Sequence, residues 1–258
     1  MSTAIPSSRD LSARALEHLL GRVAKTPAID EPFSHIFLEE VFPQDLYQRL
    51  LLSFPDLKLY NTAAERHYGN GGFTRSMFQL TASHLAMLPR PQRELWAGVA
   101  AALTAPELKQ AVFAKLHKDL AFRYSVASSD VPELPGFARP TLYRETQGFE
   151  IPPHPDTRKK VVTMHLYLPA DNNQLDLGTA LYQRKLAAWP FGTWHHRFTK
   201  VKQFAFQPNS AYAFVVNNTL TRKSWHGREK LPPGAGVRNT LLNTFYETPR
   251  EEFANYAA

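Results

Sequence analysis

The stretch Val161-Val-Thr-Met-His-Leu-Tyr-Leu168 places apolar and polar side chains in alternation. Successive side chains of a β-strand point to opposite faces, so this stretch is predicted to be a strand with one apolar face. The apolar face carries Val162, Met164, Leu166 and Leu168, and the other face carries Thr163, His165 and Tyr167. We expect the apolar face to pack against helices and the second face to line the interior of a β-barrel.

The regions before and after Pro140 differ in their predicted secondary structure. Helical periodicity dominates the first half, at residues 11–23, 43–53, 91–103 and 106–120, with one early strand at 33–38. Short β-branched and aromatic runs follow, at residues 141–144, 179–182, 204–206, 211–216 and 237–246. Helices followed by strands favour an α+β fold with helices on one side of an antiparallel barrel or sandwich. We expect one domain over 1–258, with a mainly helical part at 1–138 and a β-barrel core at 139–250.

The composition excludes several classes of chemistry. The 258 residues contain no cysteine, which excludes thiolate metal sites and leaves His and carboxylates as the strong metal ligands. The formal net charge of +7 favours anionic partners, but no long run of Lys and Arg is present, so a nucleic-acid arm is not expected. The polar N-terminus and the absence of a long apolar run predict a cytoplasmic protein without a membrane partner.

The tripeptide His154-Pro155-Asp156 lies just before the alternating strand and places two metal-ligand side chains one residue apart. In extended backbone such side chains point the same way, so both can bind one ion. A turn in which Asp156 caps local N–H groups is the alternative interpretation. His226 follows 226 − 154 = 72 residues later and supplies a third ligand. Two histidines and one carboxylate suit Fe(II), with zinc as the rival metal.

Arg238 and Thr240 share one face of the last predicted strand, and Arg238 lies 238 − 226 = 12 residues after the distal histidine. A guanidinium beside a hydroxyl is suited to hold a carboxylate by charge-assisted hydrogen bonds. Such an anchor serves a co-substrate that chelates iron with its other end, and hydrolytic zinc sites have no comparable need for it. A structural salt bridge is the alternative role of Arg238.

The order His-x-Asp, barrel strands, His and then Arg-x-Thr resembles the 2-oxoglutarate/iron(II)-dependent oxygenase superfamily. The run Gly178-Thr-Ala-Leu-Tyr182 resembles a strand of its prolyl-hydroxylase-like branch, and the match covers residues 139–246. Arg238 stands where many collagen-type prolyl hydroxylases have Lys. The resemblance implies a double-stranded β-helix, a jelly-roll or cupin-like barrel with N-terminal helices packed on one sheet. It also implies an oxidoreductase of the dioxygenase class, with hydroxylation as the default reaction.

The resemblance assigns roles to particular residues. It makes His154, Asp156 and His226 the catalytic Fe(II) ligands, and Arg238 with Thr240 the contacts to the distal carboxylate of 2-oxoglutarate, which reacts with O₂. Tyr143 is a further candidate for co-substrate binding, with packing in the sheet as its alternative. Thr163 and His165, on the interior face of the alternating strand, are predicted to contact the co-substrate or to orient a ligand. A histidine with its hydrogen bonds satisfied inside the barrel is the alternative for His165.

The substrate is predicted from weaker signals. Arg158, Lys159 and Trp225 flank the proposed ligands and are candidates to contact it, with an exposed basic turn as the alternative for the two cations. We expect a small molecule, such as an amino acid or a natural-product intermediate, that carries a negative charge. Base demethylation is disfavoured, because that branch has a second Arg where this chain has Thr244. Hydroxylation of a peptide or protein residue, a zinc hydrolase and a non-catalytic cupin-like binding barrel remain the alternatives.

A histidine pair and a glycine-rich run are both predicted to lie in loops. His195-His196 is predicted to lie in a solvated hairpin loop rather than to bind metal. The glycine-rich run at residues 68–75 lacks the ending of a phosphate-binding loop and is interpreted as a surface loop, with a substrate lid as the alternative. The sequence does not predict an oligomeric state.

Overall fold

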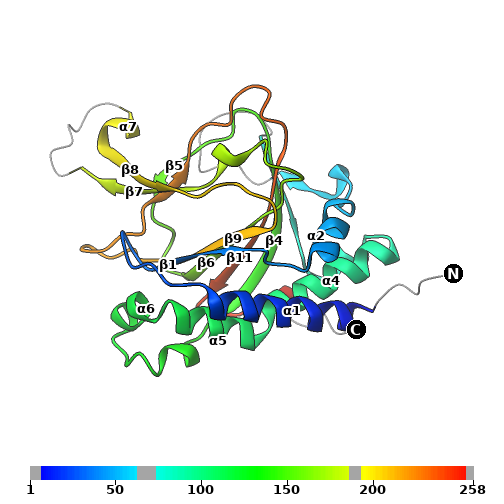
Figure 1. The fold of residues 1–258 in the computed structure, drawn as a ribbon, viewed down its shortest axis with the longest axis horizontal. Coiled ribbons are helices and arrows are strands. Elements are labelled where there is room, and N and C mark those ends of the chain that lie inside the picture. The colour runs from blue at the N-terminus through cyan, green and yellow to red at the C-terminus, as the bar shows by residue number, and fades with distance from the viewer. Residues whose placement is uncertain (1–6, 63–73, 186–192, 254–258) are drawn as a thin grey trace.

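A computed structural model describes residues 7–62, 74–185 and 193–253 (Figure 1). Most of the glycine-rich run at residues 68–75 lies outside these ranges. The helices are α1 (Ser8–Lys25), α2 (Gln44–Leu51), α3 (Ala82–Ala86), α4 (Arg90–Thr104), α5 (Pro106–Lys115), α6 (His117–Tyr124) and α7 (Trp194–Arg197). Among the described residues, no helix combines the length and apolar character needed to cross a membrane.

The strands form two antiparallel sheets. The large sheet has the order β1-β9-β6-β11-β4-β3-β2 and the small sheet the order β5-β10-β7-β8. The large sheet comprises β1 (His35–Glu39), β2 (Asn61–Thr62), β3 (Arg75–Gln79), β4 (Phe137–Glu145), β6 (Lys160–Tyr167), β9 (Ser210–Val215) and β11 (Arg238–Tyr246). The small sheet comprises β5 (Ile151–His154), β7 (Ala180–Arg184), β8 (Phe198–Gln203) and β10 (His226–Arg228). The two-sheet α+β architecture confirms the predicted fold class, although the strands form two open sheets rather than a closed barrel.

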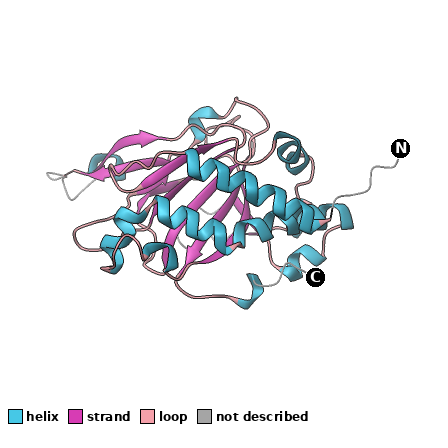
Figure 2. Cartoon of the chain, turned by 60° about the horizontal axis from the view of Figure 1, so that its bottom comes forward, coloured by secondary structure: helices cyan, strands magenta, loops and turns pink. Residues whose placement is uncertain are grey.

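The large sheet lies between the helices and the small sheet. Figure 2 shows the long helices gathered on one face of the strands, where α1 packs against α4 and α5. The apolar face of β6 belongs to this core, as its alternation predicts: Val162, Met164, Leu166 and Leu168 are all buried in one cluster with the helices. Burial of each such side chain stabilises the fold by about 1.5–3 kcal/mol. The opposite face of the sheet is thereby turned toward the small sheet, where a site can form.

A second apolar cluster lies between the sheets and explains one wrong prediction. Phe204 and Phe206 are buried there, on Tyr212 and Tyr167. They follow β8 rather than form a strand, and their backbone N–H groups donate to Thr179 and Leu175. The apolar alternation of residues 204–206 thus reports burial between the sheets and not strand pairing.

Other differences from the sequence-based expectations are local. The predicted helix at 106–120 is divided at Leu116 into α5 and α6. The predicted loop around His195 contains the short helix α7. The first half of the chain contributes β1, β2 and β3 to the large sheet in addition to its helices. Short strands at a sheet edge carry little periodic signal, because their pairing depends on residues far away in sequence.

Candidate active site

Three ligand-type side chains meet at the edge of the small sheet. β5 and β10 pair antiparallel with His154 opposite His226, and the two rings lie 4.4 Å apart between centroids. Asp156 follows β5, and its carboxylate oxygens lie 3.9 Å from Nε2 of His154 and 3.7 Å from Nε2 of His226. One ligand atom from each of the three lies within 4.8 Å of the others. The predicted His-x-Asp and distal His are therefore close enough to bind one metal ion.

Gly227 allows the two histidine strands to approach. A Cβ at this position would lie 2.5 Å from the carbonyl oxygen of Ile151, on the neighbouring strand β5. Real Cβ atoms do not approach backbone oxygen so closely, so any other residue would push the strands apart. The glycine that follows His226 thus sets the separation of the two histidines.

Backbone carbonyls orient both imidazole rings. Nδ1 of His154 lies 3.0 Å from the carbonyl oxygen of Pro152, and Nδ1 of His226 lies 2.9 Å from that of Ser224. With the proton on Nδ1, each ring presents the lone pair of Nε2 toward Asp156. Burial lowers the pKa of His226 to about 3 and also lowers the pKa of His154. Both rings are therefore neutral at physiological pH, as metal binding requires.

Lys160 and Thr163 hold the Asp156 carboxylate. Lys160 Nζ donates to Oδ1 over 2.6 Å, and the Thr163 hydroxyl donates to Oδ2 over 3.0 Å. Burial would raise the pKa of Asp156, but the charge of Lys160 and the hydrogen bond from it lower the pKa overall. Thr163 was expected to contact the co-substrate or to orient a ligand, and it contacts Asp156, whereas the contact between Lys160 and Asp156 was not predicted. The carboxylate is kept ionised, with its two oxygens fixed.

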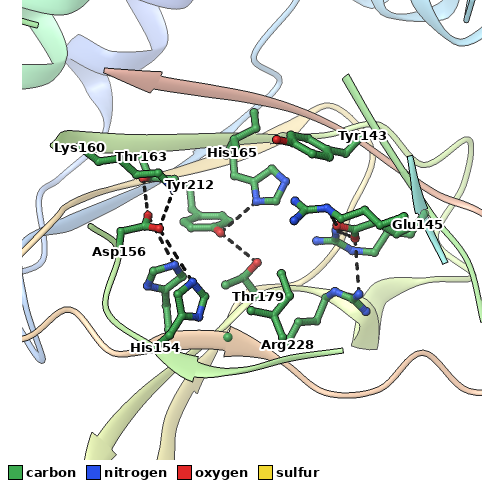
Figure 3. A pocket seen from close by; sticks show the side chains of 16 residues that line it. Tyr143, Glu145, His154, Asp156, Lys160, Thr163, His165, Thr179, Tyr212 and Arg228 are labelled. Atoms are coloured by element: carbon green, nitrogen blue, oxygen red, sulfur yellow. Dashed lines mark hydrogen bonds and ion pairs between the residues drawn. The ribbon is translucent and has the colours of Figure 1, made fainter. Parts of the chain in front are cut away.

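The three side chains open into a cavity of about 110 Å³ between the sheets. A single water needs roughly 10–15 Å³ on the same measure, so the cavity can hold a small organic molecule. Figure 3 shows His154 and Asp156 at one end and Glu145 and Arg228 at the other. The lining includes these predicted site residues: His154, Asp156, His226, Arg238, Tyr143, Thr163 and His165. Thr240 is buried and on the same face of β11 as Arg238, but it does not line the cavity.

At the far end of the cavity, three arginines surround one buried glutamate. Glu145 Oε2 accepts from Nη1 of Arg238 at 2.6 Å and lies 3.5 Å from Nη2 of Arg228. Its other oxygen lies 3.2 Å from Nε of Arg75. Burial would raise the pKa of Glu145, but Arg228, Arg238 and Arg75 together lower it to about 2. Three positive charges against one negative charge leave this end of the cavity with a surplus of two positive charges.

The arginines keep unused donors at the cavity. Nη2 of Arg238 and Nε of Arg228 are buried and have no hydrogen-bond partner within the described part of the chain. Nε of Arg238 donates to the carbonyl of Leu177 over 2.8 Å, so that guanidinium is held in place. Each buried donor without a partner costs about 1–3 kcal/mol. Charge and hydrogen bonding therefore both favour an anion here.

A hydrogen-bonded chain of neutral groups forms one wall of the cavity. Nδ1 of His165 lies 3.0 Å from the Tyr212 hydroxyl, which donates to Oγ1 of Thr179 over 2.9 Å. Burial lowers the pKa of His165 well below its ordinary value, so the ring is neutral. Its Nε2 is buried and has no hydrogen-bond partner among the residues described. The interior histidine thus keeps one nitrogen for a molecule in the cavity.

The three candidate substrate contacts lie outside this cavity. Arg158 is exposed, and its Nε donates to the carbonyl of Asn218 over 2.7 Å. Trp225 packs on Phe198 and lines a separate hollow next to β7. Lys159 lines a groove that adjoins the cavity. Their roles in substrate binding stay predictions.

Four charged residues of the site, Arg75, Glu145, Lys160 and Arg228, were not assigned to it from the sequence. The position of Arg228 could have been predicted, because Arg228 lies two residues after His226 on the same strand and side chains of a strand repeat with period two. The position of Lys160 could not be predicted from the alternation, because the pairing of β6 with β11 is irregular there. The register between β11 and β6 shifts next to Tyr246, so Lys160 pairs with Tyr246 and no longer follows the alternation of β6.

Comparison with known proteins supports the fold. No family model and no curated protein sequence matches this chain. The structure is similar to that of a prolyl-4-hydroxylase from Pseudomonas putida, with a TM-score of 0.51, 15% sequence identity, and coverage of 90% of this chain and 99% of that one. At this identity the similarity establishes a shared fold, which agrees with the predicted double-stranded β-helix.

Two weaker structural similarities have TM-scores below 0.5. SnoN, a non-heme α-ketoglutarate-dependent epimerase from nogalamycin biosynthesis, has a TM-score of 0.47 and 12% identity, covering 90% of this chain and 83% of that one. HygX from Streptomyces hygroscopicus, crystallised with nickel and 2-oxoglutarate, has a TM-score of 0.46 and 12% identity, with 83% of each chain covered. At such scores, the activity of the present chain must be argued from its own residues.

Proposed function

We propose that this chain is an Fe(II)- and 2-oxoglutarate-dependent oxygenase, an oxidoreductase that hydroxylates a small molecule and acts as a single domain over residues 1–258. The observation that carries the proposal is the polarity of one cavity. A cluster of two histidines and one aspartate lies at one end, and a surplus of buried guanidinium groups lies at the other. A metal-chelating dicarboxylate matches both ends.

The metal would be held by His154, Asp156 and His226. Three protein ligands of this kind would leave positions on a divalent ion for other molecules, as non-heme Fe(II) sites require. The two imidazoles are already neutral and the carboxylate already ionised, so the donor set fits a divalent ion. Lys160 and Thr163 keep Asp156 in position while its oxygens serve the metal.

The co-substrate would be held by the arginine end. Nη2 of Arg238 and Nε of Arg228 offer donors to a carboxylate, and Glu145 fixes the two guanidinium groups without neutralising them. Tyr143 and His165 line the same cavity and can contact the co-substrate between its two ends. Thr240 is buried and does not line the cavity, so its contact with the co-substrate stays a prediction. Fe(II), 2-oxoglutarate and O₂, when bound, supply the oxidising power for hydroxylation, with succinate and CO₂ as co-products.

Anaerobic titration with Fe(II) and 2-oxoglutarate tests the proposal. We expect a visible charge-transfer band that requires both additions and is lost in His154→Ala, and succinate release that requires Fe(II) and O₂. Arg238→Met and Arg228→Met should each raise the Kd for 2-oxoglutarate by about tenfold or more, since hydrogen bonds to charged groups contribute roughly 1.5–3 kcal/mol. A binding barrel would release no succinate, and a zinc hydrolase would act without O₂; either result would overturn the proposal.

A further inference from the structure

A groove adjoins the cavity on the side of the Asp156 loop. It shares two wall residues with the cavity, Tyr143 from β4 and Leu242 from β11. Thr157 and Lys159, which follow Asp156 in the chain, form part of its rim. Its volume is about 340 Å³, against about 110 Å³ for the cavity. The groove therefore has room for a molecule larger than the cavity can hold, and Tyr143 and Leu242 are the two lining residues that it shares with the cavity.

The charge of the groove has one sign. Its lining contains three cations, Arg139, Lys159 and Arg250, and no acidic residue. Arg139 is fixed, because its Nη2 donates to the carbonyl of Thr248 over 2.8 Å and its guanidinium lies 3.8 Å from the centre of the Tyr246 ring. Burial and the charge of Arg250 both lower the pKa of Arg139, against smaller opposite effects of Tyr246 and Glu252, so Arg139 and Arg250 repel one another. An anion between them would relieve that repulsion.

Buried polar atoms of the groove have no partner of their own. Oγ1 of Thr244 has no hydrogen-bond partner within the described ranges of the chain, although this groove residue is only 2% exposed. Nε of Arg139 is also buried and without a partner there. A hydroxyl and a guanidinium N–H on adjacent strands β11 and β4 form a donor pair for an oxyanion. Position 244 is paired with Arg139 in the register of these strands.

We propose that this groove binds an anionic group of the substrate, a carboxylate or a phosphate ester, and so places the rest of the substrate at the candidate metal ligands. The proposal rests on the proposed function for the reaction, but the anion site can be tested without it. Arg139, Arg250 and Lys159 bind the charge, Thr244 donates a hydrogen bond, and Tyr143 and Tyr246 form apolar walls for the body of the substrate. Arg158, although adjacent to Lys159, takes no part.

Lys159 and Arg158 provide a matched pair for the test, because both are exposed neighbours and Lys159 alone of the two lines the groove. The probes are phenyl phosphate, benzoate and neutral benzyl alcohol, titrated calorimetrically into the full-length protein with and without saturating Zn(II) and 2-oxoglutarate. We expect Lys159→Gln and Arg250→Gln to raise the Kd of the anionic probes about three- to tenfold, and Arg158→Gln to change it less than twofold. Binding should weaken as salt is added. The tighter of the two anionic probes identifies a phosphate or a carboxylate as the preferred group.

The outcomes separate this proposal from the proposed function. Three results would overturn the groove as an anion site. The three variants could bind the anionic probes equally tightly, benzyl alcohol could bind as tightly as the anions, or 2-oxoglutarate could displace the probe. Loss of the iron-dependent band and of succinate release, with probe binding still sensitive to Lys159 and Arg250, would overturn the oxygenase and leave the anion site standing. Since Lys159 and Arg250 are exposed, the circular dichroism spectra of Lys159→Gln and Arg250→Gln should stay that of the wild type.

Discussion

Glu145 and Arg238 face each other directly across β4 and β11, and the 2.6 Å ion pair between them closes the cavity at the end remote from the candidate metal ligands. Arg238 is thus both partner of a buried carboxylate and a lining residue of the cavity. The two interpretations of Arg238 offered by its sequence, a salt bridge and a carboxylate anchor, are compatible in this geometry. Glu145 accepts a hydrogen bond from Nη1 of Arg238, while Nη2 of Arg238 still lacks a partner within the described residues.

Glu145→Gln is expected to destabilise the protein while favouring an added dicarboxylate. The substitution removes the counter-charge of three guanidinium groups, two of them buried, and breaking a buried ion pair costs about 3–5 kcal/mol. Thermal unfolding measures the loss, and 2-oxoglutarate should raise the Tm of the variant more than that of the wild type. Glu40→Gln removes a carboxylate that is exposed and should change the Tm little. Equal responses of variant and wild type to 2-oxoglutarate would show that the arginine cluster binds no added carboxylate.

The stabilisation from Glu145 is expected to depend on pH. The pKa of this carboxyl falls from an ordinary 4.5 to about 2 in the folded chain, so the folded state holds the proton less tightly than the unfolded state. The contribution, about 3 kcal/mol, is therefore complete above pH 4.5 and is lost as the pH falls toward 2. Urea unfolding at pH 7 and at decreasing pH below 4.5 checks this. The difference in unfolding free energy between wild type and Glu145→Gln should shrink with acid, and a constant difference would contradict the assignment.

Much of this arrangement could be predicted because it follows from local periodicity and from the order of motifs. The alternation of residues 161–168 assigned the helix-facing and cavity-facing sides of β6, and both assignments agree with the burial observed. His154, Asp156 and His226 were selected by residue type and spacing, and the fold brings them together. The alternation is a pattern of neighbouring residues, and the choice of metal ligands depends on only three positions.

The remainder depends on pairing between distant strands. Arg75 and Arg238 reach Glu145 because β3 and β11 flank β4 with both arginines opposite that residue. No local pattern specifies such a register, since it is set by the packing of whole strands. Lys160 depends on the irregular pairing at the start of β6, which strict alternation does not anticipate.

Lys160→Met is expected to weaken metal binding. The Lys160 ammonium holds Oδ1 of Asp156 at 2.6 Å and is largely buried beside it, so its removal leaves the carboxylate held at Oδ2 by Thr163 but without this partner at Oδ1. Loss of a residue that orients a metal ligand typically reduces metal affinity 10- to 100-fold. Calorimetric titration with Zn(II) measures the change, and Lys159→Met is the matched control because Lys159 makes no contact with Asp156 that the structure records. Equal weakening by both substitutions would indicate a general effect of charge instead of an effect on the ligand.

Gly227→Ala is expected to disturb the metal site through the backbone. The added Cβ would lie 2.5 Å from the carbonyl oxygen of Ile151, so β10 must move away from β5 and carry His226 away from His154. We expect a lower Tm, by several degrees for each 1 kcal/mol lost in a domain of this size, and Zn(II) affinity reduced about tenfold or more. Gly21→Ala is the control, because Gly21 is an exposed residue inside α1 with no atom near its Cβ position, and alanine favours helix there by about 1 kcal/mol. The control should therefore match or exceed the wild type in Tm and bind Zn(II) equally well. Unchanged metal affinity in Gly227→Ala would mean that the separation of the two histidine strands does not govern the site.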